Sequence, residues 1–306
     1  MRTTRVLLPA IIAIGVNHSI GEAQFLGPQQ VNALPSSTAE HRIHYDSGPF
    51  QFGDLRLPTT KERHPVAIVI HGGCWKAQHG SLVADLENTG PLSSALTSLG
   101  IATWNIEYRR IDNPGGGWPG TFQDVAHAVD YLRELAKSFP LDLNRVVVVG
   151  HSAGGHLATW AAARHRLPED SPLFSTKPLR VTGVVNLAGP GNLESFLALQ
   201  NLVCGDPVIS SLMGGVPADV PDRYRDASPS NLLPVGVKQF LIVGAQDKTV
   251  PPHFMKEYEK EATRMGDDVD LTVVENAAHF EVIAPGSVAW APVEAAVRYI
   301  LNFVVQ

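Results

Sequence analysis

Short apolar segments alternate along the chain with longer segments in which apolar residues recur at helical spacing. The short segments are rich in β-branched residues, as expected of buried strands, and lie at Pro65–Ile70, Ile101–Tyr108, Val146–Val149, Val181–Leu187, 240–244 and 269–274. The helical segments lie between and after them, at Leu92–Leu99, Thr121–Phe139, His156–Arg164, 254–265 and 290–304. Strands and helices in this order predict an α/β fold, with a mostly parallel sheet covered by helices on both faces.

Three segments depart from this alternation. The stretches Arg42–Asp46 and Gln51–Leu57 alternate apolar and polar residues, which predicts an antiparallel hairpin at one edge of the sheet. Residues 24–41, which precede them, form a polar lead. Residues 190–234 are rich in Gly, Pro, Asp and Ser, and we interpret them as a small cap-like insertion in a single domain that spans residues 42–306.

The N-terminal residues have the pattern of a secretory signal. Arg2 and Arg5 precede the apolar run Val6–Val16, and Gly21 and Ala23 stand at positions −3 and −1 of a cut before Gln24. The apolar run is too short to span a bilayer, which needs about 18 residues, and no other segment of the chain could span one. The pattern therefore predicts a signal peptide at residues 1–23 and an exported protein, either periplasmic or secreted.

Composition excludes several kinds of partner. The chain of 306 residues is 44% hydrophobic and 18% charged, which is typical of a globular protein, and its net charge of −6 argues against nucleic acid binding. Cys74 and Cys204 are the only cysteines, so they form one disulfide or remain two separate thiols. They lack the spacing of a metal site, and no phosphate-binding glycine motif is present, so we expect neither a metal nor a cofactor.

The segment Gly150-His151-Ser152-Ala153-Gly154 lies between a predicted strand and a predicted helix. A G-x-S-x-G motif in this position is typical of a nucleophile elbow, a tight turn that exposes a serine hydroxyl above the sheet. The turn is too tight for side chains at positions 150 and 154. Ser152 is therefore the predicted nucleophile.

A serine nucleophile needs a base, and the base needs an acid to orient it. Functional groups in α/β proteins gather at the carboxyl ends of strands, where this chain has Asp247 and His279. Their order after Ser152 is the Ser, Asp, His order of α/β-hydrolases. Three alternatives remain: Asp247 could instead be a turn residue that caps the following helix at Pro251, and Glu275 or Glu281 could be the acid.

The loop His71-Gly72-Gly73-Cys74-Trp75 follows the strand Pro65–Ile70. Glycines allow its backbone amides to turn toward a developing oxyanion, and we predict an oxyanion hole formed by the amides of Gly73, Cys74 and Ala153. We expect His71 to brace the loop, and His151 and His156 to pack internally or contact solvent. The glycines at 115–117, together with Trp118, are candidates for the mouth of the pocket.

Four motifs together resemble the α/β-hydrolase superfamily, and within it the esterase branch whose oxyanion loop reads H-G-G-x-W. These are the motifs at 71–75, 107–109 (Glu-Tyr-Arg), 150–157 and 279–281 (His-Phe-Glu), and they are similar to those of bacterial carboxylesterases and kynurenine formamidases. The resemblance runs from about residue 42 to 304. It implies the α/β-hydrolase fold with an eight-stranded sheet, and ester or aryl-formamide hydrolysis without a cofactor. Cys74 stands where many relatives have a third glycine.

These observations favour a serine hydrolase that cleaves carboxylic esters of small substrates through an acyl-enzyme. An arylformamidase with the same triad is the alternative, although an exported protein fits the kynurenine pathway poorly. A non-catalytic binding protein is disfavoured because no member of the triad is missing. The insertion contains only two brief apolar pieces, Phe196–Leu199 and Ile209–Met213, which predicts short acyl chains, with Trp75 and Trp118 as a flat wall for a ring.

Overall fold

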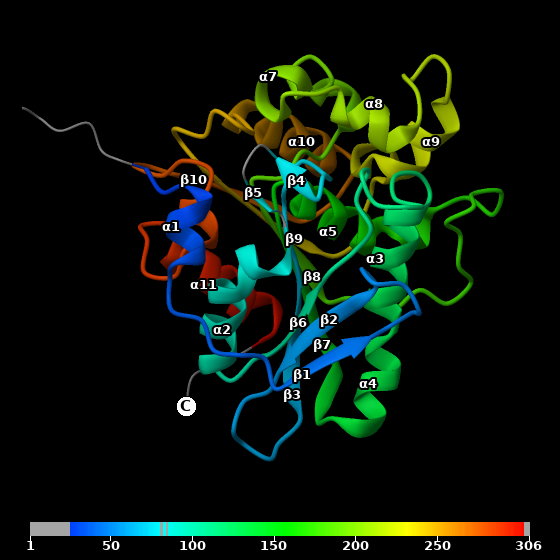
Figure 1. Ribbon diagram of the computed structural model, residues 1–306. Coiled ribbons are helices and arrows are strands. Elements are labelled where there is room, and N and C mark those ends of the chain that lie inside the picture. The colour runs from blue at the N-terminus through cyan, green and yellow to red at the C-terminus, as the bar shows by residue number, and fades with distance from the viewer. Residues whose placement is uncertain (1–24, 80–81, 84, 303–306) are drawn as a thin grey trace, which may run out of the picture.

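The computed structural model describes residues 25–79, 82–83 and 85–302, and its centre is a sheet of eight strands (Figure 1). In spatial order the strands are β1 (His41–His44), β2 (Phe52–Arg56), β6 (Ala102–Ile106), β3 (His64–Ile70), β7 (Leu141–His151), β8 (Gly183–Leu187), β9 (Lys238–Gly244) and β10 (Val269–Val274). β1 and β2 run antiparallel at one edge, β2 is antiparallel to β6, and all other pairs are parallel. The predicted edge hairpin and the eight-stranded, mostly parallel sheet are confirmed.

The central strands are apolar because helices cover both faces of the sheet. Every residue of β3 and β6 is buried, and the register places Ile68 between Trp104 and Val148. Strands enclosed in this way have no solvent face on which polar residues could alternate. This is why they appear in the sequence as continuous apolar runs.

Helices α2 (Gly90–Ser98) and α11 (Trp290–Ile300) cover one face, and α3 (Gly120–Asp130), α4 (Leu132–Ser138) and α5 (Ala153–Ala163) cover the other (Figure 1). Helix α10 (Pro252–Arg264) packs on β9 and β10. The single helix predicted at Thr121–Phe139 is interrupted at Tyr131. The helix predicted at His156–Arg164 begins earlier, at Ala153, directly after Ser152.

Other elements had no clear signal in the sequence. Residues 190–234 contain four short α-helices: α6 (Leu193–Phe196), α7 (Gln200–Cys204), α8 (Val208–Met213) and α9 (Pro221–Ala227). Of these, α7, α8 and α9 lie at one end of the molecule with α10 (Figure 1). The remaining elements are α1 (Pro28–Asn32), the pair β4 (Gln78–His79) and β5 (Leu82–Val83), and the 3₁₀ helices η1 (Leu86–Thr89), η2 (Arg164–Arg166), η3 (Pro229–Leu232) and η4 (Glu281–Ile283). Helices this short depend on tertiary packing rather than on intrinsic propensity.

The predicted signal peptide at residues 1–23 lies outside the described residues, so export stays a prediction. The last predicted helical positions, 303 and 304, also lie outside them. Among the helices that the structure describes, none has the length and apolar character needed to cross a membrane.

Candidate active site

Ser152 lies in the turn between β7 and α5, with φ 54° and ψ −120°. A positive φ is uncommon for a residue other than glycine, and strained positions of this kind cluster at functional sites. A Cβ on Gly150 would lie 2.0 Å from the carbonyl oxygen of Gly154, and a Cβ on Gly154 would lie 2.2 Å from that of Ile70. The backbone therefore passes too close at both positions for any other residue, as the elbow motif predicts.

Asp247 and His279 form a buried pair at the carboxyl ends of β9 and β10. Nδ1 of His279 lies 2.7 Å from Oδ2 of Asp247, and the two side chains are 8% and 0% exposed. Because an ionised carboxylate only accepts hydrogen bonds, His279 donates from Nδ1 and leaves Nε2 able to accept a proton. This is the tautomer that a general base for serine requires.

The second oxygen of Asp247 shapes the turn that follows. Oδ1 accepts hydrogen bonds from the backbone amides of Thr249 and Val250, both at 2.8 Å. Asp247 thus stabilises the turn before Pro251 while its other oxygen contacts His279. It does not cap the following helix, because α10 has Pro251 as its N-cap and no side-chain capping hydrogen bond, so that alternative is wrong.

The two competing glutamates occupy other positions. Glu281 accepts a hydrogen bond from the amide of Ala278 at 2.8 Å and another from the amide of Leu26 at 2.5 Å. It therefore supports the loop that carries His279 and the segment that includes α1. Glu275 is exposed to solvent. The geometry favours Asp247 as the partner of His279.

His151 connects the elbow to the loop that carries His279. Its Nε2 lies 2.9 Å from the backbone oxygen of His279, and the centroids of the two imidazole rings are 4.6 Å apart. Burial lowers the pKa of His151 well below its ordinary value of 6.5, so the ring is neutral and donates this hydrogen bond. His151 is buried and does not contact solvent. Because it directly precedes Ser152, its contact with His279 holds the loop of His279 next to the elbow.

The glycine loop after β3 lies against the elbow. A Cβ on Gly72 would approach the Cβ of Ser152 to 3.0 Å, which shows how closely the two segments pass. Gly73, Cys74 and Trp75 all have positive φ, at 111°, 54° and 55°. Three successive positive φ values form a tight turn, and backbone amides in turns can line a concave site that suits an anion. Ala153 is the first residue of α5, so its amide has no partner within the helix.

His71 braces this loop, as expected. Its Nε2 lies 3.0 Å from Oε1 of Glu107, and its ring stacks on Tyr108, whose hydroxyl donates to the carbonyl of His71 at 2.9 Å. Burial raises the pKa of Glu107, but His71, Arg110 and the amide of Tyr108 together lower it by more. The pKa therefore lies below its ordinary value, and Glu107 remains ionised. Glu107 and Tyr108 had no role assigned from the residues alone, and only the Glu-Tyr-Arg motif in the resemblance indicated them.

His156 links the same loop to the helices of residues 190–234. The indole of Trp75 donates to Nδ1 of His156 at 3.3 Å, and Nε2 of His156 donates to the carbonyl of Ala227, the last residue of α9, at 2.9 Å. The ring is completely buried, and burial lowers its pKa from 6.5 to about 4. His156 is therefore neutral, with both ring nitrogens engaged, and does not contact solvent.

Acidification is expected to destabilise the protein through His156. Between pH 6.5 and about 4 the unfolded chain binds a proton at this histidine that the folded chain excludes, so the free energy of unfolding falls as the pH falls. The contribution is complete above pH 6.5, and its loss near pH 4 amounts to about 3 kcal/mol. Urea unfolding of the parent and of His156→Gln at several pH values tests this. The variant should lose less stability per pH unit, and equal slopes would contradict the assignment.

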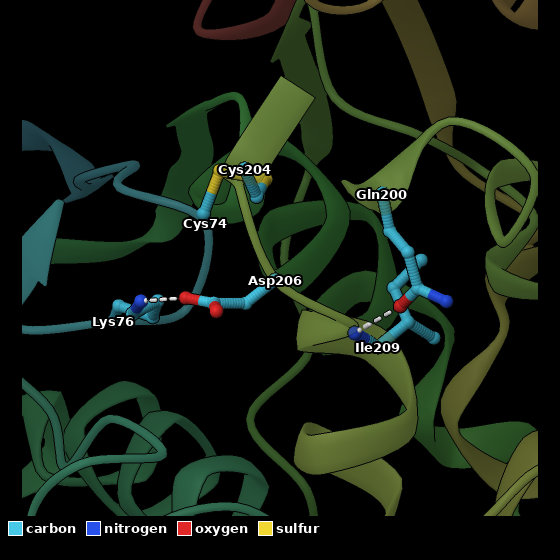
Figure 2. Close-up of a disulfide and its surroundings, with 6 residues drawn as sticks. All are labelled: Cys74, Lys76, Gln200, Cys204, Asp206 and Ile209. Atoms are coloured by element: carbon cyan, nitrogen blue, oxygen red, sulfur yellow. Dashed lines mark hydrogen bonds and ion pairs between the residues drawn. A yellow bond between two sulfur atoms is a disulfide. The ribbon is translucent and has the colours of Figure 1, made fainter. Parts of the chain in front are cut away.

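Cys74 and Cys204 are joined in a disulfide with a Cα–Cα distance of 6.0 Å, so the bonded alternative predicted from the sequence is correct (Figure 2). Disulfides persist in oxidising compartments, which agrees with the predicted export. The bridge joins the glycine loop to the last residue of α7.

A small cavity lies at Ser152. Its lining residues come from the elbow, the glycine loop, residues 190–234 and the turn after Asp247: Cys74, Trp75, Ser152, Ala153, Pro190, Phe196, Val203, Cys204, Thr249 and Val250. The volume of the cavity is about 10 Å³, roughly the room that one water molecule needs. Trp118 is not one of these residues; its amide donates to the carbonyl of Leu212 in α8 at 2.7 Å, and its ring packs edge-on against Phe122. Within the described part of the chain, no group of three His, Cys, Asp or Glu residues could hold a metal ion.

Comparison with known proteins identifies a family and relatives described as esterases. The family model described as BD-FAE matches residues 54–261. A probable carboxylic ester hydrolase, LipM of Mycobacterium tuberculosis, is 29% identical over 204 residues, which are 65% of this chain and 44% of that protein. Esterase LipC of the same organism is 28% identical over 214 residues, which are 69% of this chain and 51% of that protein. The chain thus spans about half the length of the curated relatives it matches.

Solved structures share the fold. A truncated form of a carbohydrate esterase from gut microbiota superposes with a TM-score of 0.69 at 20% identity, over 88% of this chain and 96% of that one. At this identity the likeness concerns the fold, and it identifies the sheet and its helices as an α/β-hydrolase fold.

Proposed function

The chain belongs to the BD-FAE family, and from this membership and the geometry around Ser152 we propose that it hydrolyses carboxylic esters of small substrates. The observation that carries the proposal is the buried pair of Asp247 and His279, whose imidazole packs against His151, the residue that precedes the strained Ser152. The esterase activity named for its curated relatives supports the same reaction.

In the proposed reaction, Oγ of Ser152 attacks the acyl carbon while Nε2 of His279 takes the serine proton. Asp247 holds the imidazole in the required tautomer and stabilises the positive charge that His279 gains. The tetrahedral intermediate then collapses: the bond to the alcohol oxygen breaks, and His279 returns the proton to the leaving alcohol. The acyl group remains on Ser152 as an ester.

Water completes the cycle. His279 takes a proton from a water molecule, whose oxygen attacks the acyl carbon, and the bond to Oγ of Ser152 breaks as the proton returns to the serine. In both halves we assign stabilisation of the oxyanion to the backbone amides of Gly73, Cys74 and Ala153. The first two follow Gly72, which passes close to Ser152, and Ala153 directly follows the serine. No cofactor is required in this scheme.

The cavity at Ser152 supports a preference for short acyl chains. With room for roughly one water molecule, it accommodates an acetyl group far better than a long chain. We expect kcat/KM on p-nitrophenyl esters to be highest at about two to four acyl carbons and to fall by about eight. Steady-state kinetics on a series with a constant leaving group measures this. Efficiency that rises up to about twelve carbons would contradict the proposal and indicate a lipase.

A formyl group is smaller than acetyl, so the small size of the same cavity also suits aryl-formamide hydrolysis, which is the second candidate function. An aryl formamide in the same substrate series separates the two functions. If its kcat/KM exceeds that of every ester in the series, formamide hydrolysis is the main reaction.

A further inference from the structure

The disulfide forms part of the wall of the cavity at Ser152. Cys74 comes from the glycine loop and Cys204 from the end of α7, and both line the cavity together with Val203 of the same helix. One side of the cavity is therefore carried by residues 190–204, and the bond between the two sulfur atoms joins this side to the loop beside the serine (Figure 2).

The helix that carries this wall is internally fixed. The side-chain oxygen of Gln200, at the start of α7, accepts a hydrogen bond from the amide of Ile209 in α8 at 2.8 Å (Figure 2). Gln200 itself is buried. This contact attaches the start of α7 to the start of α8, where Val208 and Ile209 are completely buried, so the end of α7 at Cys204 is the part that the disulfide holds.

By contrast, within the part of the chain that the structure describes, few contacts hold the end of α7 against the glycine loop. The helix has five residues, and Leu202 in its middle is 83% exposed, so α7 buries little apolar surface. Outside the cavity, Lys76 pairs with Asp206, two residues beyond each cysteine (Figure 2). The Asp206 side chain is 55% exposed, and ion pairs at such positions contribute little to stability. The disulfide is thus the main attachment between the two walls.

We propose that the Cys74–Cys204 disulfide determines the acyl-chain specificity of the enzyme by holding α7 close to Ser152. While the bond is intact, the wall formed by Val203 and Cys204 cannot move outward, and acyl groups longer than the cavity are excluded. Once it is broken, the end of α7 that carries Val203 and Cys204 moves away from the glycine loop, and longer chains enter. This inference rests on the proposed ester hydrolysis and deepens it.

The test compares p-nitrophenyl octanoate with p-nitrophenyl acetate. We expect the ratio of their kcat/KM values to rise by about tenfold or more in Cys204→Ser, and equally in the parent treated with a dithiol that reduces the bridge. In the dithiol treatment, the dithiol is oxidised to its cyclic disulfide and each cysteine sulfur gains one hydrogen. Thiol titration confirms the state of the bridge, and thermal unfolding confirms that each sample is folded.

Lys76→Met is the matched control, because it removes the ion pair with Asp206 between the same two segments but no atom of the cavity wall. Its ratio should remain within about twofold of the parent. An unchanged ratio in folded Cys204→Ser or in the reduced parent would overturn the inference. The inference would also be overturned if the bridge of the parent resists reduction and Cys204→Ser cannot fold. The bond would then serve the fold alone. If the parent hydrolyses neither ester, the proposed function fails instead.

Discussion

Replacement of Ser152 by Ala is expected to lower kcat/KM on p-nitrophenyl acetate by at least about 10⁴-fold. Alanine has no hydroxyl to attack the acyl carbon, so an acyl-enzyme cannot form. The residual rate should come from the oxyanion hole and substrate binding alone, which in serine hydrolases leaves roughly 10³-fold over the uncatalysed reaction. Activity within about tenfold of the parent would remove Ser152 from the mechanism.

The fold should tolerate this change. Ser152 is already at φ 54°, and alanine has the same Cβ, so the strain in the turn is unchanged. Thermal unfolding of the variant should match the parent, which separates loss of chemistry from loss of structure. Ser138→Ala, at an exposed position near the end of α4, is the matched control and should keep full activity. A fluorophosphonate should label the parent and the control but not Ser152→Ala.

The sheet could be predicted because its strands are enclosed. Each residue of β3 is buried, and a continuous apolar run such as Val146–Val149 has few other structural solutions. The candidate site followed from the same pattern, because Asp247 and His279 directly follow the predicted strands. Sequence position alone thus brought together two residues that lie 32 positions apart.

The helices of residues 190–234 could not be predicted for an equally physical reason. They have four to seven residues, too few for a helical period to stand out. Their apolar residues are held by contacts with distant parts of the chain, as Tyr224 shows: it is completely buried although its neighbours along α9 are mostly polar. Likewise the polar lead contains Val31, completely buried in a short helix.

The roles of the two histidines beside the elbow were hidden for a different reason. His151 donates to a backbone carbonyl 128 positions away, and His156 to one 71 positions away. No local pattern encodes a partner of this kind, since any carbonyl in the chain could serve. The sequence could show only that His151 and His156 flank the nucleophile.

Replacement of Asp247 by Asn is expected to lower kcat/KM on p-nitrophenyl acetate by about 10³ to 10⁴-fold, less than the loss of His279 in His279→Ala. An asparagine can turn its amide nitrogen toward Nδ1 of His279 and donate to it. The imidazole proton then moves to Nε2, which can no longer accept the proton of Ser152. The side-chain oxygen that remains can still accept from Thr249 and Val250, so the turn keeps its hydrogen bonds.

Steady-state kinetics with a folding control measures this effect, and Glu275→Gln provides the comparison. Glu275 is exposed one residue after β10, four positions before His279, and its replacement removes a carboxylate without touching a buried contact. We expect Glu275→Gln to keep activity within about twofold of the parent. If it were more damaging than Asp247→Asn, the acid would be Glu275. The 2.7 Å contact between Asp247 and His279 would then serve the fold, since Asp247 would still close its own turn through Thr249 and Val250.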